Sequence, residues 1–89
     1  MSDSTPADSR FNDFILFQAQ NAGLFLGQLP HPLTGQRSVN LHAARTVLDS
    51  LEMLVGKTAG NLSELEDELL TKALVNLRAL YNEAEELGA

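Results

Sequence analysis

Few side chains in this sequence can carry out chemistry. It contains two histidines, His31 and His42, and no cysteine. A metal site or a general base would need these histidines to act with a carboxylate such as Asp49, but neither has a second ligand at the spacing of known metal sites. No nucleophile with its own base can be identified. The pattern therefore favours solvent-exposed histidines and predicts a protein that is not an enzyme and has no cofactor. A small-molecule or metal-binding site in the loop 30–34 is the alternative.

Two further motifs resemble ligand sites without meeting their requirements. Gly56-Lys57-Thr58 matches the end of a phosphate-binding loop, but the motif's first glycine would fall at Leu51, and the preceding segment has a helical pattern where a strand is needed. The acidic run 64–68 lacks the alternating ligands and central glycine of a calcium-binding loop. Negative charge is instead favourable in the first turn of a helix. We therefore interpret the first motif as part of a turn and the acidic run as the start of a helix.

The most regular element lies between residues 40 and 55, and its apolar residues recur at the spacing of one helical stripe. This stripe contains Leu41, Ala44, Val47, Leu48, Leu51, Leu54 and Val55. Asn40 can accept a hydrogen bond from the first turn, and Gly56 can take the left-handed conformation just past the last turn. The pattern predicts an amphipathic helix with one buried face.

A further helix is predicted to begin at Ser63, which forms a capping-box pattern with Glu66. We expect a surface pair between Glu68 and Lys72. The apolar face of this helix contains Leu65, Leu69, Leu70, Ala73, Leu74, Leu77, Leu80, Tyr81, Ala84 and Leu87. Because the turn before Ser63 is short, this helix should lie antiparallel to the preceding one.

The segment from Phe11 to about Leu29 has the pattern of a helix that is apolar nearly all round, with Ser9 or Asn12 available as its cap. Its main stripe contains Phe11, Phe14, Ile15, Ala22, Phe25, Leu26 and Leu29, whereas Leu16, Phe17 and Leu24 project from the far side. Such a helix is buried on more than one face. After it, Pro30 and Pro32 favour an extended course and Thr34-Gly35 a turn, so this longer connector lets the first helix cross the other two at a wider angle.

Small residues lie on a third face of this first helix. Ala19, Gly23 and Gly27 are spaced four apart beside Leu16, Gln20 and Leu24, and a groove of this kind lets another helix approach closely. Alternatively, Gly27 ends the helix and Gly23 is tolerated at a cost of about 1 kcal/mol. A membrane span is disfavoured because the helical part is shorter than the roughly 20 residues that a bilayer requires.

Composition and charge narrow the classes of partner. The formal charge is −6, and the six basic residues are scattered, which disfavours nucleic acid. Residues 1–10 form a polar, acidic tail that we expect to be disordered, followed by one helical domain over 11–87. The tail has no signal-peptide pattern and the chain has no cysteine, so we expect a cytoplasmic protein.

Several short motifs resemble the small bacterial proteins of domain-of-unknown-function family 1844. The resemblance runs from about Phe11 to Tyr81. It rests on Leu26-Gly27, Pro30, Pro32, Thr34-Gly35, Asn40-Leu41, Ala44, Asp49, Leu51, Leu54, Lys57-Thr58 and Gly60-Asn61-Leu62. It implies a helical, cytosolic, bacterial protein and brings no activity, cofactor or catalytic residue with it. Val55, Gly56 and Ala59 stand where the family has more polar or charged residues, and Ser63 where threonine is usual.

These observations predict an all-α protein of three helices. An antiparallel hairpin is crossed by the N-terminal helix, and the whole is completed as a dimeric helical bundle, because Leu16, Phe17 and Leu24 would otherwise remain as an exposed apolar patch. The expected function is that of a small helical protein–protein interaction or homodimerisation module. Its expected partner is a second copy or another helical protein, with neither nucleic acid nor a membrane. The predicted interface consists of Leu16, Phe17, Ala19, Gln20, Gly23, Leu24 and Gly27.

Overall fold

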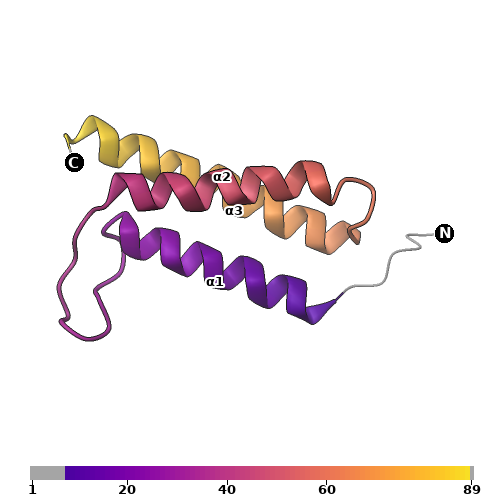
Figure 1. Ribbon diagram of the computed structural model, residues 1–89, viewed down its shortest axis with the longest axis horizontal. Helices are drawn as coiled ribbons and strands as arrows, with labels where there is room; N and C mark the ends of the chain where they lie inside the picture. The colour runs from indigo at the N-terminus through magenta and orange to yellow at the C-terminus, as the bar shows by residue number, and fades with distance from the viewer. Residues whose placement is uncertain (1–7, 89) are drawn as a thin grey trace.

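The computed structural model describes residues 8–88, which form three helices. They are α1 (Ser9–Phe25), α2 (Leu41–Lys57) and α3 (Glu64–Glu86). Figure 1 shows α2 and α3 as a hairpin, with α1 running lengthwise beside it. The wide crossing angle that we expected from the length of the connector is not apparent in this view. Each helix packs against the other two. Among the described residues the only β pairing is an isolated antiparallel bridge between Leu26 and Val39, which confirms the all-α class.

Helix α1 begins two residues earlier than the predicted Phe11. Its N-cap is Asp8 and neither Ser9 nor Asn12, because the Asp8 carboxylate accepts a hydrogen bond from the Arg10 amide at 2.9 Å. Asp8, Ser9 and Arg10 therefore belong to the helix start. The rest of the predicted tail, residues 1–7, lies outside the described residues.

The same helix ends at Phe25, four residues before the predicted Leu29. Gly27 has a φ of 76°, and the Gln28 amide donates to the Gly23 carbonyl at 2.9 Å while the Gly27 amide donates to the Leu24 carbonyl at 3.2 Å. These two bonds form a Schellman motif, which satisfies the last carbonyls of the helix. The alternative in which Gly27 ends the helix is thus the one observed.

Of the three other helix ends that the sequence predicted, two agree with the structure. The Asn40 side chain accepts from the Ala43 amide at 3.0 Å, and Ser63 and Glu66 form the predicted capping box. The predicted end at Gly56 is wrong, because α2 continues through Lys57 to a C-cap at Thr58. The left-handed residue of the turn is Gly60, with a φ of 82°.

The core lies along the line where the three helices meet. Its buried hydrophobic residues are Ile15, Ala22, Leu26, Ala44, Val47, Leu48, Leu51, Leu70, Leu74, Leu77 and Ala84. Five residues that the sequence placed on buried stripes are instead exposed: Phe14, Leu29, Val55, Leu65 and Leu87. Glu66 occupies the buried position in the first turn of α3, and a neighbouring residue is turned by about 100° along a helix, so Leu65 faces outward. None of the three helices described is both long and apolar enough to span a membrane.

Candidate functional site

The first candidate site is an apolar surface on α1. We call Phe14, Leu16, Phe17, Gln20 and Leu24 the α1 outer face. The side chains of Leu16 and Phe17 are 51% and 59% exposed, and Leu24 is half-buried. Of the three residues that the sequence placed on the far side of this helix, the structure therefore leaves Leu16 and Phe17 uncovered. A monomer seldom keeps neighbouring large apolar side chains exposed unless they contact something.

The small residues of the predicted interface lie elsewhere. Ala19 packs against the core, and Gly23 is buried beneath the chain's own connector. A Cβ on Gly23 would lie 3.5 Å from Leu29 Cδ1, which is an ordinary van der Waals contact. A Cβ on Gly27, beyond the helix end, would lie 3.1 Å from Val39 Cγ2. Leu16, Phe17, Gln20 and Leu24 thus lie on the outer side of α1, whereas Ala19, Gly23 and Gly27 contact parts of the same chain.

A groove continues the α1 outer face onto the connector between α1 and α2. It has a volume of about 330 Å³ and is lined by Gln20, Asn21, Leu24, Leu29, Pro30 and Pro32. Immediately after Pro32, the side chain of Leu33 is 90% exposed. From the sequence this connector was expected to form turns and, as the alternative, a ligand site at 30–34, but its residues were not expected to form part of an apolar surface. The signal that could have revealed them is the apolar run Leu29-Pro30-His31-Pro32-Leu33 in a segment expected to face water.

The connector folds back on itself through a series of hydrogen bonds. At its base the Asn40 amide donates to the Phe25 carbonyl at 2.6 Å, next to the Leu26–Val39 bridge. Further out, the Arg37 guanidinium donates to the Gln28 carbonyl at 3.1 Å and the His31 amide donates to the Gln36 carbonyl at 2.8 Å. Figure 1 shows this loop extending past the helix ends.

The family-motif residues of the connector build its outermost turn. The Gly35 amide donates to the His31 carbonyl at 2.8 Å, and Gly35 has a φ of 71° that favours glycine. The Gln36 amide donates to Thr34 Oγ1 at 3.2 Å. The Leu33 amide donates to His31 Nδ1 at 3.1 Å, so this histidine nitrogen is an acceptor within the loop. The turn is therefore ordered by its own side chains.

The geometry does not supply a ligand set for the alternative metal site. Within residues 8–88, no three histidine, aspartate or glutamate side chains lie close enough to share a metal ion. Asp49 forms an ion pair with Arg45 at 3.2 Å along the exposed side of α2. His31 and His42 are both exposed.

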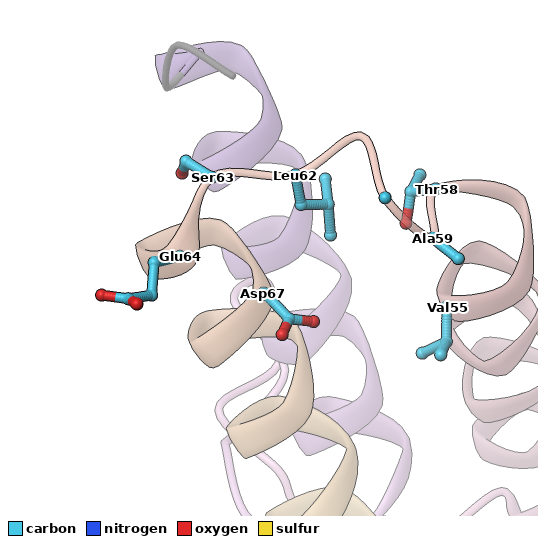
Figure 2. Close-up of a pocket in the computed structure, with 8 residues that line it drawn as sticks. Val55, Thr58, Ala59, Leu62, Ser63, Glu64 and Asp67 are labelled. Atoms are coloured by element: carbon cyan, nitrogen blue, oxygen red, sulfur yellow. The ribbon is translucent and has the colours of Figure 1, made fainter. Parts of the chain in front are cut away.

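A second candidate site lies under the turn between α2 and α3. This pocket has a volume of about 380 Å³ and is lined by Val55, Thr58, Ala59, Gly60, Leu62, Ser63, Glu64 and Asp67. Figure 2 shows Asp67 directed toward the gap between the two helices and Glu64 directed to the outside. Thr58 Oγ1 donates to the Leu54 carbonyl at 2.6 Å, and the Asn61 amide donates to the Thr58 carbonyl at 2.8 Å. The polar groups of this turn thus complete the end of α2 and close the chain reversal.

The family-motif residues of this turn have conformational roles. Gly60 supplies the left-handed position, and Asn61 Nδ2 donates to the Ala59 carbonyl at 3.4 Å. Lys57 is exposed in the last turn of α2, where a positive charge is favourable. The role of these family-motif residues is therefore to allow a short turn between α2 and α3. They are Lys57, Thr58, Gly60 and Asn61.

Glu66 links the first and last helices. It is 3% exposed, and its carboxylate accepts hydrogen bonds from the Ser63 amide at 2.9 Å and the Asp8 amide at 2.6 Å. These backbone hydrogen bonds, from Ser63 first and then Asp8, hold the pKa of Glu66 below its usual range. The hydrogen bond from the Arg10 side chain to Asp8 lowers the pKa of that exposed aspartate to about 2. The sequence predicted the capping box, but not the bond to Asp8, because that residue lies 58 positions away.

Charged side chains are concentrated on α2 and α3. Ion pairs there join Arg45 to Asp49, Glu68 to Lys72 and Glu52 to Arg78, and the second of these, at 3.8 Å, is the predicted surface pair. Between Asp13 and Arg37 the sequence has no acidic or basic residue apart from His31. The groove is therefore uncharged, and the α1 outer face carries a charge only at its N-terminal edge, where the exposed Asp13 lies one turn before Leu16 and Phe17.

These features define a class: a small three-helix domain with a largely apolar outer face on its first helix and a hydrogen-bonded connector beside it. The chain belongs to the family described as a domain of unknown function (DUF1844), whose model matches residues 8–83. This confirms the resemblance found in the sequence and extends it by a few residues at each end. No curated protein and no solved structure matches the chain.

Proposed function

We propose that this protein is a self-associating module whose α1 outer face is covered by a second copy of the chain. The observation that carries the proposal is the exposure of Leu16 and Phe17, two consecutive large apolar residues of α1, at 51% and 59%. Burying such a side chain completely is favourable by about 1.5–3 kcal/mol, so covering the exposed half of each contributes roughly half of that. The proposal includes no catalytic step and keeps the expectation of a bacterial, cytoplasmic protein.

The charge distribution supports a second copy as the occupant of this face. Each chain carries a formal charge of −6, so two copies repel one another wherever their acidic surfaces meet. A contact centred on the part of α1 from Leu16 to Leu24 and on the groove lets two copies approach with the Asp13 carboxylates at its edge and no other acidic side chain within it. A twofold axis through this face would make both partners bury the same residues.

A pair of charge substitutions tests the proposal. Phe17→Glu places a carboxylate in the proposed contact, whereas Val75→Glu places one on α3 at a side chain that is also 59% exposed. Light scattering after size-exclusion chromatography, over a series of loading concentrations, gives the dissociation constant of each variant. We expect Phe17→Glu to weaken the dimer by roughly 30-fold or more, as for other central interface residues. Val75→Glu should leave the constant within a few-fold of wild type.

Equal effects of the two substitutions would contradict the proposal, because they would reflect added net charge alone. A wild-type protein that remains a monomer at the highest concentration would overturn the proposal.

A further inference from the structure

The connector between α1 and α2 is longer than the fold requires. The Asn40 amide, at the start of α2, donates directly to the Phe25 carbonyl at the end of α1, at 2.6 Å. The Leu26–Val39 bridge lies beside this bond. The end of α1 and the start of α2 are therefore already in contact. Residues 27–38 form a loop that is not needed to bridge a gap between them. Helix connections in bundles usually have about 2–8 residues, and longer ordered ones are commonly functional.

This excursion is ordered although it has little core to pack against. Of its large apolar side chains, only Leu29 and Val39, at 43% and 42% exposed, are substantially covered where they contact Gly23 and Gly27, so burial contributes mainly at the base of the connector. The bonds from Arg37 to Gln28 and from His31 to Gln36 hold the two limbs together, and Pro30 and Pro32 restrict the backbone between them. Ordering a loop in advance reduces the entropy lost when it binds.

The loop holds one large apolar side chain out in water. Leu33 is 90% exposed, which is the highest value among the large hydrophobic residues described. Its amide is fixed by His31 Nδ1. Directly before it in the chain, Pro32 lines the groove that Leu24 and Leu29 also line. A protruding leucine and an apolar groove thus lie next to each other on one chain.

We infer that Leu33 of each copy inserts into the groove of the other copy. This inference rests on the proposed self-association and names the contact that makes it specific. Because the projecting residue and the groove are neighbours, a twofold axis between them exchanges both at once and gives a closed dimer. The groove of about 330 Å³ is large enough, since an apolar cavity of about 150 Å³ holds a molecule the size of benzene.

The electrostatics of the loop agree with this arrangement. From residue 28 to residue 36 it carries no acidic or basic side chain apart from His31. The charge of Arg37 is directed back to the Gln28 carbonyl. Inserting the loop into a second groove therefore buries no carboxylate, guanidinium or ammonium group that would lack a partner.

Truncation of the leucine is the first test. Leu33→Ala should weaken the dimer by roughly 30-fold or more while leaving the helical circular-dichroism signal unchanged, because the side chain contributes almost nothing to the core. Leu65→Ala is the matched control, since Leu65 is 71% exposed on α3. It should leave the dissociation constant unchanged.

Site-directed cross-linking is the second test. Because the chain contains no cysteine, an introduced thiol can form a disulfide only with another introduced thiol. A ¹⁵N-labelled Leu33→Cys variant is mixed with an unlabelled Gln20→Cys variant, whose new thiol lies in the groove. After mild oxidation, mass spectrometry should find mainly a disulfide between one labelled and one unlabelled chain. Met53→Cys replaces Gln20→Cys in the control, because Met53 is exposed on α2 outside the groove, and should give no such product.

The outcomes separate this inference from the proposal on which it rests. A wild-type dimer that Leu33→Ala leaves unchanged, or a cross-link mainly between two Leu33→Cys chains, would overturn the insertion while the dimer stands. A monomeric wild-type protein would overturn both.

Discussion

The two connections between the helices lie at opposite ends of the bundle and differ in what orders them (Figure 1). In the turn between α2 and α3, Thr58 and Ser63 complete helix ends, and Leu62 packs against the core. In the connector between α1 and α2, the ends are closed at Phe25 and Asn40, yet the chain continues out to Leu33. The first connection serves the fold, whereas the second is ordered beyond what the fold needs.

This difference points to the connector between α1 and α2, and not to the turn between α2 and α3, as the functional region. The family-motif residues fall in both connections, so their presence alone does not distinguish a structural role from a functional one. The distinction comes from burial, because the polar groups of the α2–α3 turn are used by helix ends and the connector presents apolar side chains to water. Changes in the turn should therefore affect stability, and changes in the connector should affect association.

Replacing the outer part of the connector should have the largest effect. A variant in which Gly-Ser-Gly replaces residues 29–37 keeps Gly27 and the Leu26–Val39 bridge, so the helices remain joined. We expect the dimer to weaken by roughly 100-fold, or about 2.7 kcal/mol, because both Leu33 and much of the groove are lost. A shorter loop also closes at a slightly lower entropic cost.

Two measurements read out this variant. At a concentration low enough for both proteins to be monomers, circular dichroism should show the helices retained with a melting temperature within about 8 °C of wild type, the shift expected for about 1 kcal/mol. Light scattering should show a monomer at concentrations where wild type is a dimer. Loss of helical structure would show that the fold needs the connector. An unchanged dissociation constant would show that the connector does not take part in association.

Acid should destabilise the fold through Glu66. Its carboxylate accepts hydrogen bonds from the Ser63 and Asp8 amides, which lower its pKa from the ordinary 4.5. Since the folded pKa is the lower one, this contribution to stability is fully present above the unfolded pKa and is lost as pH falls through the folded pKa.

The measurement is the urea midpoint between about pH 6 and pH 3, where carboxylates of this kind become protonated. Wild type should lose stability across this range, and Glu66→Gln should be less stable at neutral pH but lose less on acidification. Glu64→Gln is the matched control, because Glu64 is exposed in the same helical turn. The same acid dependence in wild type and Glu66→Gln would show that this buried link contributes little.

Removing the cap of α3 should have a smaller effect. Ser63→Ala removes the side-chain oxygen that accepts from the Glu66 amide at 3.2 Å, and the loss of such a cap costs about 1 kcal/mol. Thermal unfolding should show a fall in melting temperature of about 4–8 °C. Ser50→Ala, at an exposed position within α2, should have no such effect. A weakened dimer in Ser63→Ala at unchanged stability would give the turn a role in association.

The smallest predicted effect concerns His31. His31→Ala removes the nitrogen that accepts from the Leu33 amide, so the tip of the loop loses one bond of about 0.5–1.5 kcal/mol and the dimer should weaken by a few-fold. His31→Asn should restore most of the affinity, because an asparagine oxygen can accept from the amide two residues on. Dilution calorimetry can compare the three proteins. If His31→Asn were no tighter than His31→Ala, the bond would not position Leu33.

Features encoded within one helix were well predicted from the sequence. The caps at Asn40 and Ser63 depend on side chains one turn away, and the outward direction of Leu16 and Phe17 follows from helical spacing alone. Features that depend on a distant segment were missed. Glu66 is buried because the Asp8 amide reaches it from the other end of the chain, and Gly23 is covered because the connector places Leu29 over it.

The ends of elements were also less predictable than their middles. Gly56 has the right residue type to end α2, but the chain uses Thr58 and Gly60 instead, since either position is compatible with the local sequence. Likewise, periodicity placed Leu65 and Leu87 on a buried face, but the first and last turns of α3 leave them exposed. The groove could not be foreseen because it forms only when the connector folds back beside α1.

The most direct test is the mass of the wild-type protein by sedimentation equilibrium over a wide range of concentrations. The proposal predicts that the mass rises from that of one 9.7 kDa chain to twice that value and then stays constant, because a twofold contact closes. A mass that remains at one chain at the highest concentration, with Leu16 and Phe17 still exposed, would contradict it.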